Sequence, residues 1–384
     1  MTLLGLLLWH PRGSRRRRSA ISTGRMSGGR GSIVHRLHVN GNWLAHSGSE
    51  TSRYAAEMVR AIADAGRFDL IVHVPANAEE VNGLPTGNPR VTVRQARFSG
   101  LAFEQVYLPA VTMGRQLLNF EGSAPLLKHR QLVTMHDAAP FRRPIGIGRA
   151  FVTRHYLTYW WLGRVAEGLA TVSLYSAHEL SDVLRIDVDR FIVAGGSADT
   201  LTGVRPERPE WAPSGDYYMV VDTAAQHDIV CATVHAMSRS GREVVVVGMR
   251  GAPRAPVPPR QAVFAGHLSD AELVWLYRHS RGLVLPSTYE GFGMSALEAQ
   301  ALGCPVVSSD AAALPEICHD GALYFDPDEP DTLLAQLDRL ETEIGLADDL
   351  RQRGLVNARR FSWSDAAQRI LDWVGVTRIR RRHG

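Results

Sequence analysis

The stretch PSTYEGFGMSALEAQALGCPVV, residues 286–307, is the part of the sequence that decides the expected fold class. Apolar residues 282–285 precede it, as in a buried strand, and residues 294–302 have the composition of a helix. Gly291 and Gly293 lie in the loop between them, and Val306 and Val307 begin a second apolar run. A strand, a glycine-containing loop, a helix and a strand in this order are typical of a parallel α/β sheet.

The same alternation of apolar runs and helix-period segments extends over most of the chain. It predicts strands at residues 33–39, 68–74, 132–135, 170–174, 217–221, 243–247, 263–265 and 282–285. It predicts helices at residues 50–65, 149–167, 176–184, 229–240 and, after a Ser-Asp-Ala-Glu capping box, 269–279. Residues 202–214 contain three prolines among polar residues, which indicates a linker between two Rossmann-like domains.

Charge and cysteine content bound the class of protein. The chain has 384 residues and a formal net charge of +4, but seven arginines lie before residue 31 with no acidic residue among them. The rest is therefore net negative, which argues against a nucleic-acid-binding body. The three cysteines, Cys231, Cys304 and Cys318, are too widely spaced for a disulfide framework or a thiolate zinc site. A cytoplasmic protein is expected.

The two ends of the chain are basic. The apolar residues 1–9 are too short to span a bilayer, and positive charge follows them instead of preceding them, so we expect neither a signal peptide nor a transmembrane helix. Met26 is an alternative start, after which residues 27–32 add only glycine, serine and arginine. The terminal arginines suit peripheral contact with the inner membrane face, although solvated tails explain them equally well.

Two carboxylates share the glycine-containing loop and the helix that follows it. Glu290 lies on the loop and Glu298 about one turn inside the helix, so both can face one crevice at the sheet edge. Gly291 and Gly293 allow close approach of backbone amides to a ligand, and the helix N-terminus behind them favours phosphate. Because a carboxylate accepts hydrogen bonds from a vicinal diol, this combination indicates a nucleotide-sugar site.

These residues resemble a known family. Glu290 and Glu298, preceded by Pro-Ser-x-Tyr and followed by Ala-x-x-x-Gly-x-Pro-Val-Val, are similar to the E-x7-E signature of the retaining, GT-B-fold glycosyltransferases of family 4. Further similar patterns occur in order at residues 40–43, 52–55, 104–109, 134–140, 171–176, 266–277, 309–316, 322–327 and 361–363. Those in the first half are similar to family members that build bacterial surface polysaccharides. The resemblance covers roughly residues 33–375.

The resemblance implies a GT-B architecture, in which two Rossmann-like domains face each other across a cleft. An acceptor domain would span residues 33–204 and a nucleotide-sugar domain residues 205–360. Residues 361–384 would form a helix that packs back on the first domain and a basic tail, and residues 1–32 a disordered basic tail.

The resemblance also implies an activity and a role for each matching residue. The reaction would transfer a hexosyl unit, with retention, from a nucleotide sugar to a lipid-linked saccharide or a polysaccharide, with no cofactor and no metal. Glu298 would bind the ribose hydroxyls, Glu290 would contact the transferred sugar, and His136 would lie near the reacting centre. The donor would also contact the loop residues Gly291, Phe292, Gly293 and Met294. Gly48, in an earlier loop, would face the acceptor and the diphosphate.

The chain departs from the family where the diphosphate is usually clamped. A glycine and an Arg-Lys pair are usual there, whereas this sequence has Val221, Gln226 and His227. Two buried charge-assisted contacts to phosphate would be worth a few kcal/mol. Arg250, just after the strand expected at residues 243–247, is the best candidate for a replacement cation.

Other classes of protein remain as alternatives. A catalytically silent GT-B protein that scaffolds an active partner would keep the fold without donor turnover. A nucleotide-sugar epimerase of the same fold is a weaker alternative. A Rossmann dehydrogenase is weaker still, because no G-x-G-x-x-G follows the first strand with an acidic residue about 20 positions later.

Overall fold

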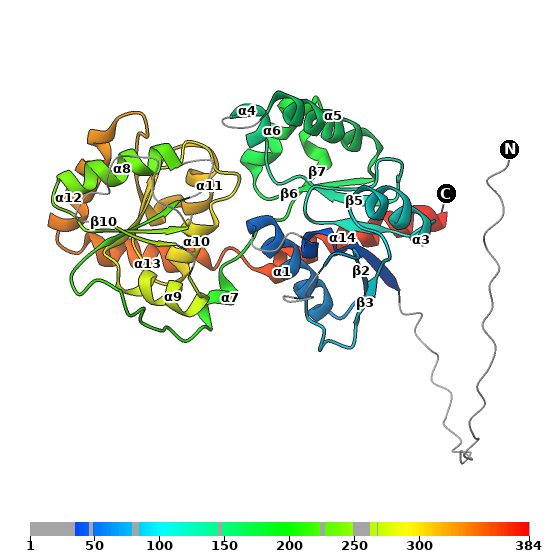
Figure 1. Ribbon diagram of the computed structural model, residues 1–384, viewed down its shortest axis with the longest axis horizontal. Helices are drawn as coiled ribbons and strands as arrows, with labels where there is room; N and C mark the ends of the chain where they lie inside the picture. Colours follow the sequence, from blue (N-terminus) through cyan, green and yellow to red (C-terminus); the bar gives the residue numbers. More distant parts are fainter. Residues whose placement is uncertain are drawn as a thin grey trace, which may run out of the picture. The chain divides into compact units, whose positions relative to one another are not determined.

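The computed structural model describes residues 35–45, 49–78, 84–144, 148–222, 227–248, 262–266 and 268–383, and two parallel sheets organise this part of the chain (Figure 1). The first sheet has the order β3-β2-β1-β4-β5-β6-β7. Its strands are β1 (Arg36–Asn40), β2 (Asp69–Val74), β3 (Val91–Gln95), β4 (Leu117–Asn119), β5 (Gln131–Thr134), β6 (Gly168–Thr171) and β7 (Phe191–Val193). Two parallel-sheet α/β domains, as expected from the sequence, are confirmed.

The second sheet has the order β10-β9-β8-β11-β12-β13, and all its strand pairs are parallel. Its strands are β8 (Tyr218–Asp222), β9 (Val244–Gly248), β10 (Ala262–Gly266), β11 (Gly282–Leu285), β12 (Val306–Ser309) and β13 (Ala322–Phe325). Their apolar runs, such as the four consecutive valines of β9, are buried because successive side chains point to opposite, covered faces.

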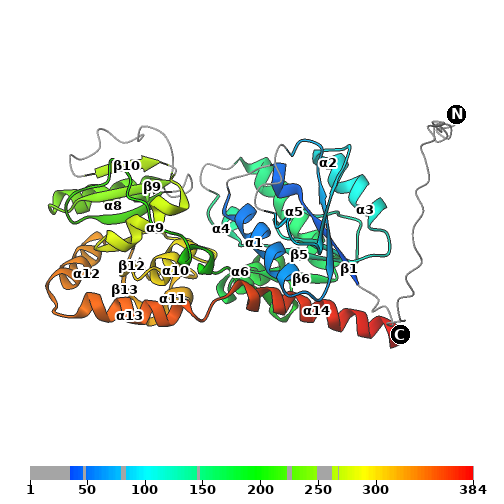
Figure 2. The same cartoon turned by 90° about the horizontal axis from the view of Figure 1, so that it is seen from below.

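Helices cover both faces of the first sheet. On one face, α1 (Glu50–Asp64) and α14 (Trp363–His383) share a core with Leu37 and Val39 of β1 and Leu70 of β2. On the other face, α5 (Arg149–Val165) and α6 (Leu174–Leu184) pack on Val133 and Leu169. Figure 2 shows α14, in red, running along the strands of this sheet although it ends the chain.

The second sheet is covered in the same way. One face holds α9 (Asp270–His279), α10 (Met294–Ala301) and α11 (Leu314–Cys318), and the other α8 (His227–Arg239), α12 (Pro330–Thr342) and α13 (Leu346–Ala358). The expected capping box is present: the Ser269 hydroxyl accepts from the Glu272 amide, and the Glu272 carboxylate accepts from the Ser269 amide. It fixes the start of α9.

Short elements connect the main ones. They are η1 (Asn42–Ala45), α2 (Gly100–Ala102), the π-helix η2 (Phe103–Tyr107), α3 (Leu108–Val111), α4 (Ala139–Arg142), η3 (Val188–Arg190), α7 (Asp199–Thr202) and η4 (His319–Gly321). Residues 203–217, where the prolines predicted a linker, contain no helix or strand. The domain boundaries drawn from the sequence stay predictions. Among the described residues, no helix combines the length and apolar character that a membrane span needs.

The structure corrects two local predictions. The strand expected at residues 170–174 is wrong in position: β6 ends at Thr171, because the Ser173 hydroxyl caps the next helix by accepting from the Ser176 amide. Strands β3, β4, β7 and β13 were not expected, since β3 is half exposed and the other three have only three or four residues each. Short or polar segments lack the periodicity on which strand prediction depends.

Two buried histidines bridge neighbouring strands of the first sheet. His38 Nδ1 lies 2.8 Å from His73 Nε2, and the rings stack. His73 Nδ1 also lies 3.2 Å from the Tyr107 hydroxyl. Burial, with Arg115 nearby, lowers the pKa of His38 to about 4, and burial, with His38 nearby, lowers the pKa of His73 to about 3. Both side chains are therefore neutral at physiological pH.

We expect this pair to make folding sensitive to acid. The unfolded chain binds protons at these positions near pH 6.5, whereas the folded chain does not until about pH 4, so stability is full above pH 6.5 and is lost as the pH falls. The free energy of unfolding should drop by about 2–3 kcal/mol for each histidine, about 5 kcal/mol for the pair, between pH 7 and pH 4.5, measured by urea denaturation. His73→Gln should lessen this slope, and His235→Gln, at an exposed position, should not. Equal slopes in both variants would contradict the assignment.

Candidate functional site

A cavity of about 170 Å³ brings together residues from helices and loops of both sheets. Its walls come from the start of α1, the segments after β5, β6 and β7, the loop between β11 and α10, α10 itself and the first residue of α14. Seven of the residues singled out from the sequence line it: His136, Glu290, Gly291, Phe292, Gly293, Met294 and Glu298. Gly48 and Arg250 lie outside the described residues.

Glu298 is the buried carboxylate of this cavity. Its side chain is on α10, 4% exposed, and its Oε1 accepts a 2.7 Å hydrogen bond from Nη1 of Arg53 on α1. The Tyr277 hydroxyl donates to Oε2 at 3.4 Å. Burial raises the pKa of Glu298 to about 7, and the Arg53 guanidinium acts in the opposite direction. Arg53, on a helix that covers the first sheet, therefore pairs with Glu298, on a helix that covers the second sheet.

The loop before α10 approaches the first sheet's segments closely. The Gly291 carbonyl accepts hydrogen bonds from the hydroxyls of Ser173 at 2.6 Å and Ser176 at 2.9 Å. A Cβ on Gly291 would lie 2.8 Å from the Cβ of Asp137, so only glycine fits without a shift. Gly293 has a φ of +96° and precedes α10, which directs the helix N-terminus at the cavity.

Glu290 is held at the edge of the same cavity. The Ser287 hydroxyl donates to its Oε1 at 2.9 Å, and its backbone carbonyl accepts from the Ala313 amide at 3.2 Å. These contacts fix both the side chain and the backbone of the loop. The carboxylate is thereby preorganised on the cavity wall rather than free in solvent.

His136 follows β5 and is packed against Tyr54, with ring centroids 5.0 Å apart in an edge-on arrangement. Its Nε2 lies 2.8 Å from the Phe120 carbonyl, to which it must donate, so Nδ1 is the acceptor nitrogen of a neutral ring. Burial lowers the pKa of His136. The ring is therefore oriented and kept uncharged at neutral pH.

Further contacts hold the two halves of the cavity together. The Glu316 carboxylate accepts from the Leu174 and Tyr175 amides, both at 2.8 Å, at the N-terminus of α6. The Tyr289 hydroxyl accepts from the Ala138 amide at 3.2 Å. In both contacts, backbone amides that follow strands of the first sheet bind a side chain that follows a strand of the second.

The altered clamp region contains an internal pair. His227, the first residue of α8, donates from Nδ1 to Asp222 Oδ2 at 2.7 Å, and its Nε2 lies 3.5 Å from Cys231 Sγ. Asp222 is buried at the end of β8. The imidazole is thus bound to an acid of its own domain. Gln226, the other residue at the altered clamp positions, lies outside the described residues.

Sequence reasoning gave no role to Arg53, although it stands in the matched pattern at residues 52–55. It is the only Arg or Lys among the described residues that line the cavity, whereas Glu50, Asp137, Glu290 and Glu298 all line it. No local signal marks an arginine on a helix face as the partner of an acid 245 residues later. Only the fold brings the two together.

We expect Gly291→Ala to destabilise the protein. The added methyl would meet Asp137 at 2.8 Å, and the hydrogen bonds of Ser173 and Ser176 prevent the loop from moving away. Overpacking of this kind costs about 1–3 kcal/mol in the free energy of unfolding, measured by urea denaturation. Gly148→Ala is the control, because no atom lies within 4 Å of its Cβ position. Unchanged stability of both variants would mean that the loop does not pack as described.

The chain is similar in sequence to glycosyltransferases. Residues 258–356 match the family described as "Glycosyl transferases group 1". O-antigen chain mannosyltransferase B from Escherichia coli is 35% identical over 109 residues, which are 28% of this chain and 29% of that protein. O-antigen chain mannosyltransferase RfbU from Salmonella typhimurium is 22% identical over 375 residues, covering 88% of this chain and 99% of that protein. The chain thus matches less than a third of the first relative's length.

The fold is similar to that of solved glycosyltransferases. Sucrose-phosphate synthase from Thermosynechococcus elongatus superimposes with a TM-score of 0.70 at 16% sequence identity, over 91% of this chain and 100% of that chain. The expected GT-B fold is therefore confirmed. Residues 258–356 are thus similar to the group 1 glycosyltransferases, and the chain's fold is similar to that of sucrose-phosphate synthase.

Proposed function

We propose that this protein is a retaining glycosyltransferase of family 4 that moves a hexosyl unit, most simply mannosyl, from a nucleotide sugar to a saccharide acceptor of a bacterial surface polysaccharide. The observation that carries the proposal is the convergence of Glu290, Glu298, His136 and the amides of residues 291–293 on one cavity. The names of two relatives, both O-antigen chain mannosyltransferases, support the mannosyl unit and the acceptor class. A lipid-linked acceptor belongs to the same proposal.

Each group in the cavity has a role that its chemistry suits. Glu298 accepts hydrogen bonds from the ribose hydroxyls, and Glu290 accepts from hydroxyls of the transferred sugar. When the bond from the sugar C1 to the diphosphate oxygen breaks and one from C1 to the acceptor oxygen forms, negative charge grows on the diphosphate, which also takes up the proton that the acceptor hydroxyl loses. The amides of residues 291–293 and the N-terminus of α10 stabilise that charge.

His136 acts beside the reacting carbon. Its Nε2–H is held by the Phe120 carbonyl, so the ring is fixed and neutral and Nδ1 can accept a hydrogen bond from the sugar. A charged imidazolium would attract the departing diphosphate instead, and burial of His136 works against that state by lowering its pKa. The residue therefore orients the donor sugar.

Arg53 supplies positive charge where the family's usual clamp is altered. The ribose hydroxyls would bind the Glu298 carboxylate, whose Oε1 accepts from the Arg53 guanidinium in this structure. The described cavity, about 170 Å³, is also smaller than the roughly 300–1,000 Å³ typical of ligand pockets. We propose that donor binding enlarges the cavity and moves the Arg53 guanidinium from Glu298 to the diphosphate. The guanidinium would then neutralise the diphosphate in place of a metal ion. Full transfer in the presence of EDTA is expected.

A catalytically silent protein that supports an active glycosyltransferase is the second candidate. The pairing of His227 with Asp222 favours it, because a side chain at the usual clamp position is directed at an acid of its own domain. This candidate predicts a folded protein that releases no nucleoside diphosphate from any nucleotide sugar. Turnover of one donor would exclude it.

Two substitutions separate donor binding from transfer. Glu298→Gln should weaken nucleoside diphosphate binding at least about tenfold in calorimetry, because an amide replaces the charged acceptor for ribose. His136→Ala should keep its affinity for the nucleoside diphosphate, which lacks the sugar that the ring contacts, but should transfer sugar about 100-fold more slowly, because the donor sugar is no longer oriented. Glu329→Gln, at an exposed position just before α12, is the control. Unaltered donor affinity in Glu298→Gln would remove the donor site from this cavity.

Arg53→Gln tests the role of the guanidinium. If Arg53 moves to the diphosphate, the variant should bind a nucleoside diphosphate at least about tenfold more weakly, because a charge-assisted contact is lost. Its affinity for the bare nucleoside should be equal or higher, since Glu298 is no longer occupied. Tighter binding of both ligands would instead show that Arg53 only blocks the site. Arg60→Gln, on the outer part of α1, is the matched control.

A further inference from the structure

The outward face of α5 carries large apolar side chains that the first sheet does not cover. Leu157 is 56% exposed, Trp161 42% and Trp160 37%, whereas Phe151, at the start of the helix, is 45% exposed and stacks on His155 of the inward side. Trp160 and Trp161 are therefore not core residues. The inward face of the helix is already filled by Tyr159 and Leu162, which pack on the sheet. Three partly exposed side chains of this size on one face of a helix indicate an interaction surface.

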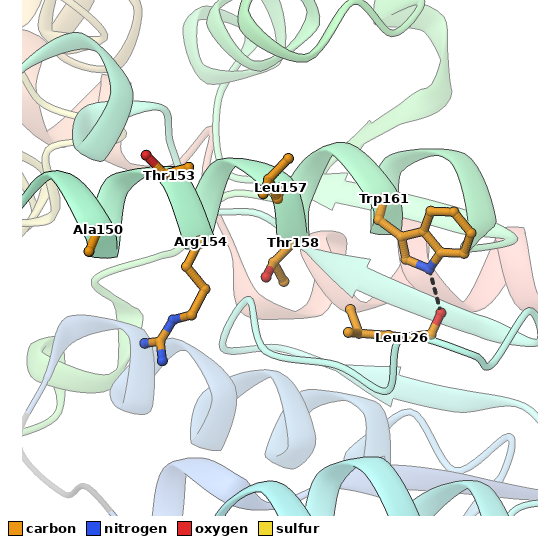
Figure 3. Close-up of a pocket in the computed structure, with 7 residues that line it drawn as sticks. All are labelled: Leu126, Ala150, Thr153, Arg154, Leu157, Thr158 and Trp161. Atoms are coloured by element: carbon orange, nitrogen blue, oxygen red, sulfur yellow. Dashed lines mark hydrogen bonds between the residues drawn. The ribbon is translucent and has the colours of Figure 1, made fainter.

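This face borders an open groove of about 560 Å³. Figure 3 shows Ala150, Arg154, Leu157 and Trp161, at intervals of three or four residues, along α5 beside Leu126. The Trp161 indole N–H donates to the Leu126 carbonyl at 2.8 Å, which fixes the ring in its exposed position. The aromatic side chain is therefore held outward by the fold rather than left free.

Charge on the same face is uniformly positive. Between residues 138 and 166 the sequence contains no Asp or Glu. Arg149, Arg154 and Arg164 project from α5, and across the described part of the chain none of the three forms a salt bridge. Arg164 lies 4.0 Å above the Trp160 ring, and Arg154 lies 5.8 Å from the Phe151 ring. Cations beside aromatic rings, without acids, are complementary to an anionic surface.

Neighbouring segments extend the apolar surface. Leu127, next to the residue that binds Trp161, is 89% exposed. Lys128 donates from Nζ to the Thr112 carbonyl at 2.8 Å, which ties this loop to the end of α3, where Met113 is 78% exposed. The exposed apolar side chains thus continue from α5 into the adjoining loop.

We propose that the outward face of α5, with Leu127, binds the surface of an anionic lipid bilayer. Tryptophan is favoured at the depth of the lipid headgroups, and arginines beside it can contact lipid phosphates. The inward side of the same helix contacts the segment that follows His136, because Tyr159 packs on Phe141. Membrane binding through α5 would therefore hold the cavity near the bilayer. The proposal does not depend on the transfer reaction.

Vesicle co-sedimentation of the full chain tests this proposal without donor or acceptor. The protein should bind vesicles of phosphatidylcholine with phosphatidylglycerol much more strongly than vesicles of phosphatidylcholine alone, and salt should weaken the binding. The double variant Leu157→Gln/Trp160→Gln should lower the partition coefficient at least about tenfold, because its apolar side chains no longer enter the interface. Ile344→Gln, fully exposed on the other half of the chain, is the matched control.

Three outcomes would overturn the proposal. Equal binding to both kinds of vesicle would exclude anionic lipid as the ligand. Unchanged binding by the double variant, with unchanged thermal stability, would assign the contact to another part of the chain, such as the terminal arginines. Sedimentation velocity that shows a dimer for the natural chain and a monomer for the variant would make this face a contact between two copies instead.

Discussion

The candidate site depends on one ion pair, between Arg53 of α1 and Glu298 of α10. A carboxylate that is 4% exposed is costly to ionise unless a cation or several donors compensate it. Here the compensating cation is Arg53, which lies on a helix of the first sheet. It reaches Glu298, on a helix of the second sheet, at the cavity bordered by the glycine-containing loop. The same contact therefore neutralises the acid, occupies its oxygen and links the two halves of the site.

This arrangement connects the structure to the proposed reaction. An acid kept paired in the absence of ligand is ready to exchange its partner for hydroxyl groups, and the released guanidinium is ready to meet a diphosphate. The close contacts around Gly291 hold the loop in position while that exchange occurs. Because the usual clamp position holds a histidine bound to Asp222, the cation has to come from elsewhere, and Arg53 lies in the cavity.

The sequence predicted what local patterns encode. The glycine loop, the helix after it and the buried strands around it follow from composition and periodicity over a few residues, and the two-sheet fold follows from their order. The pairing of Arg53 with Glu298 could not be predicted, because it joins residues 245 positions apart. The exposure of Trp160 and Trp161 could not be predicted either, because only the packing of α5 on the sheet shows which of its faces is uncovered.

The most direct test of the central claim is a crystal structure of the protein with a nucleoside diphosphate bound, chosen from uridine, guanosine, thymidine and adenosine diphosphates by affinity. Our account predicts that the ribose hydroxyls contact Glu298, that the diphosphate lies against residues 291–293, and that Arg53 has left Glu298 for the phosphates. A nucleotide bound elsewhere while the Arg53–Glu298 pair stays intact would contradict it.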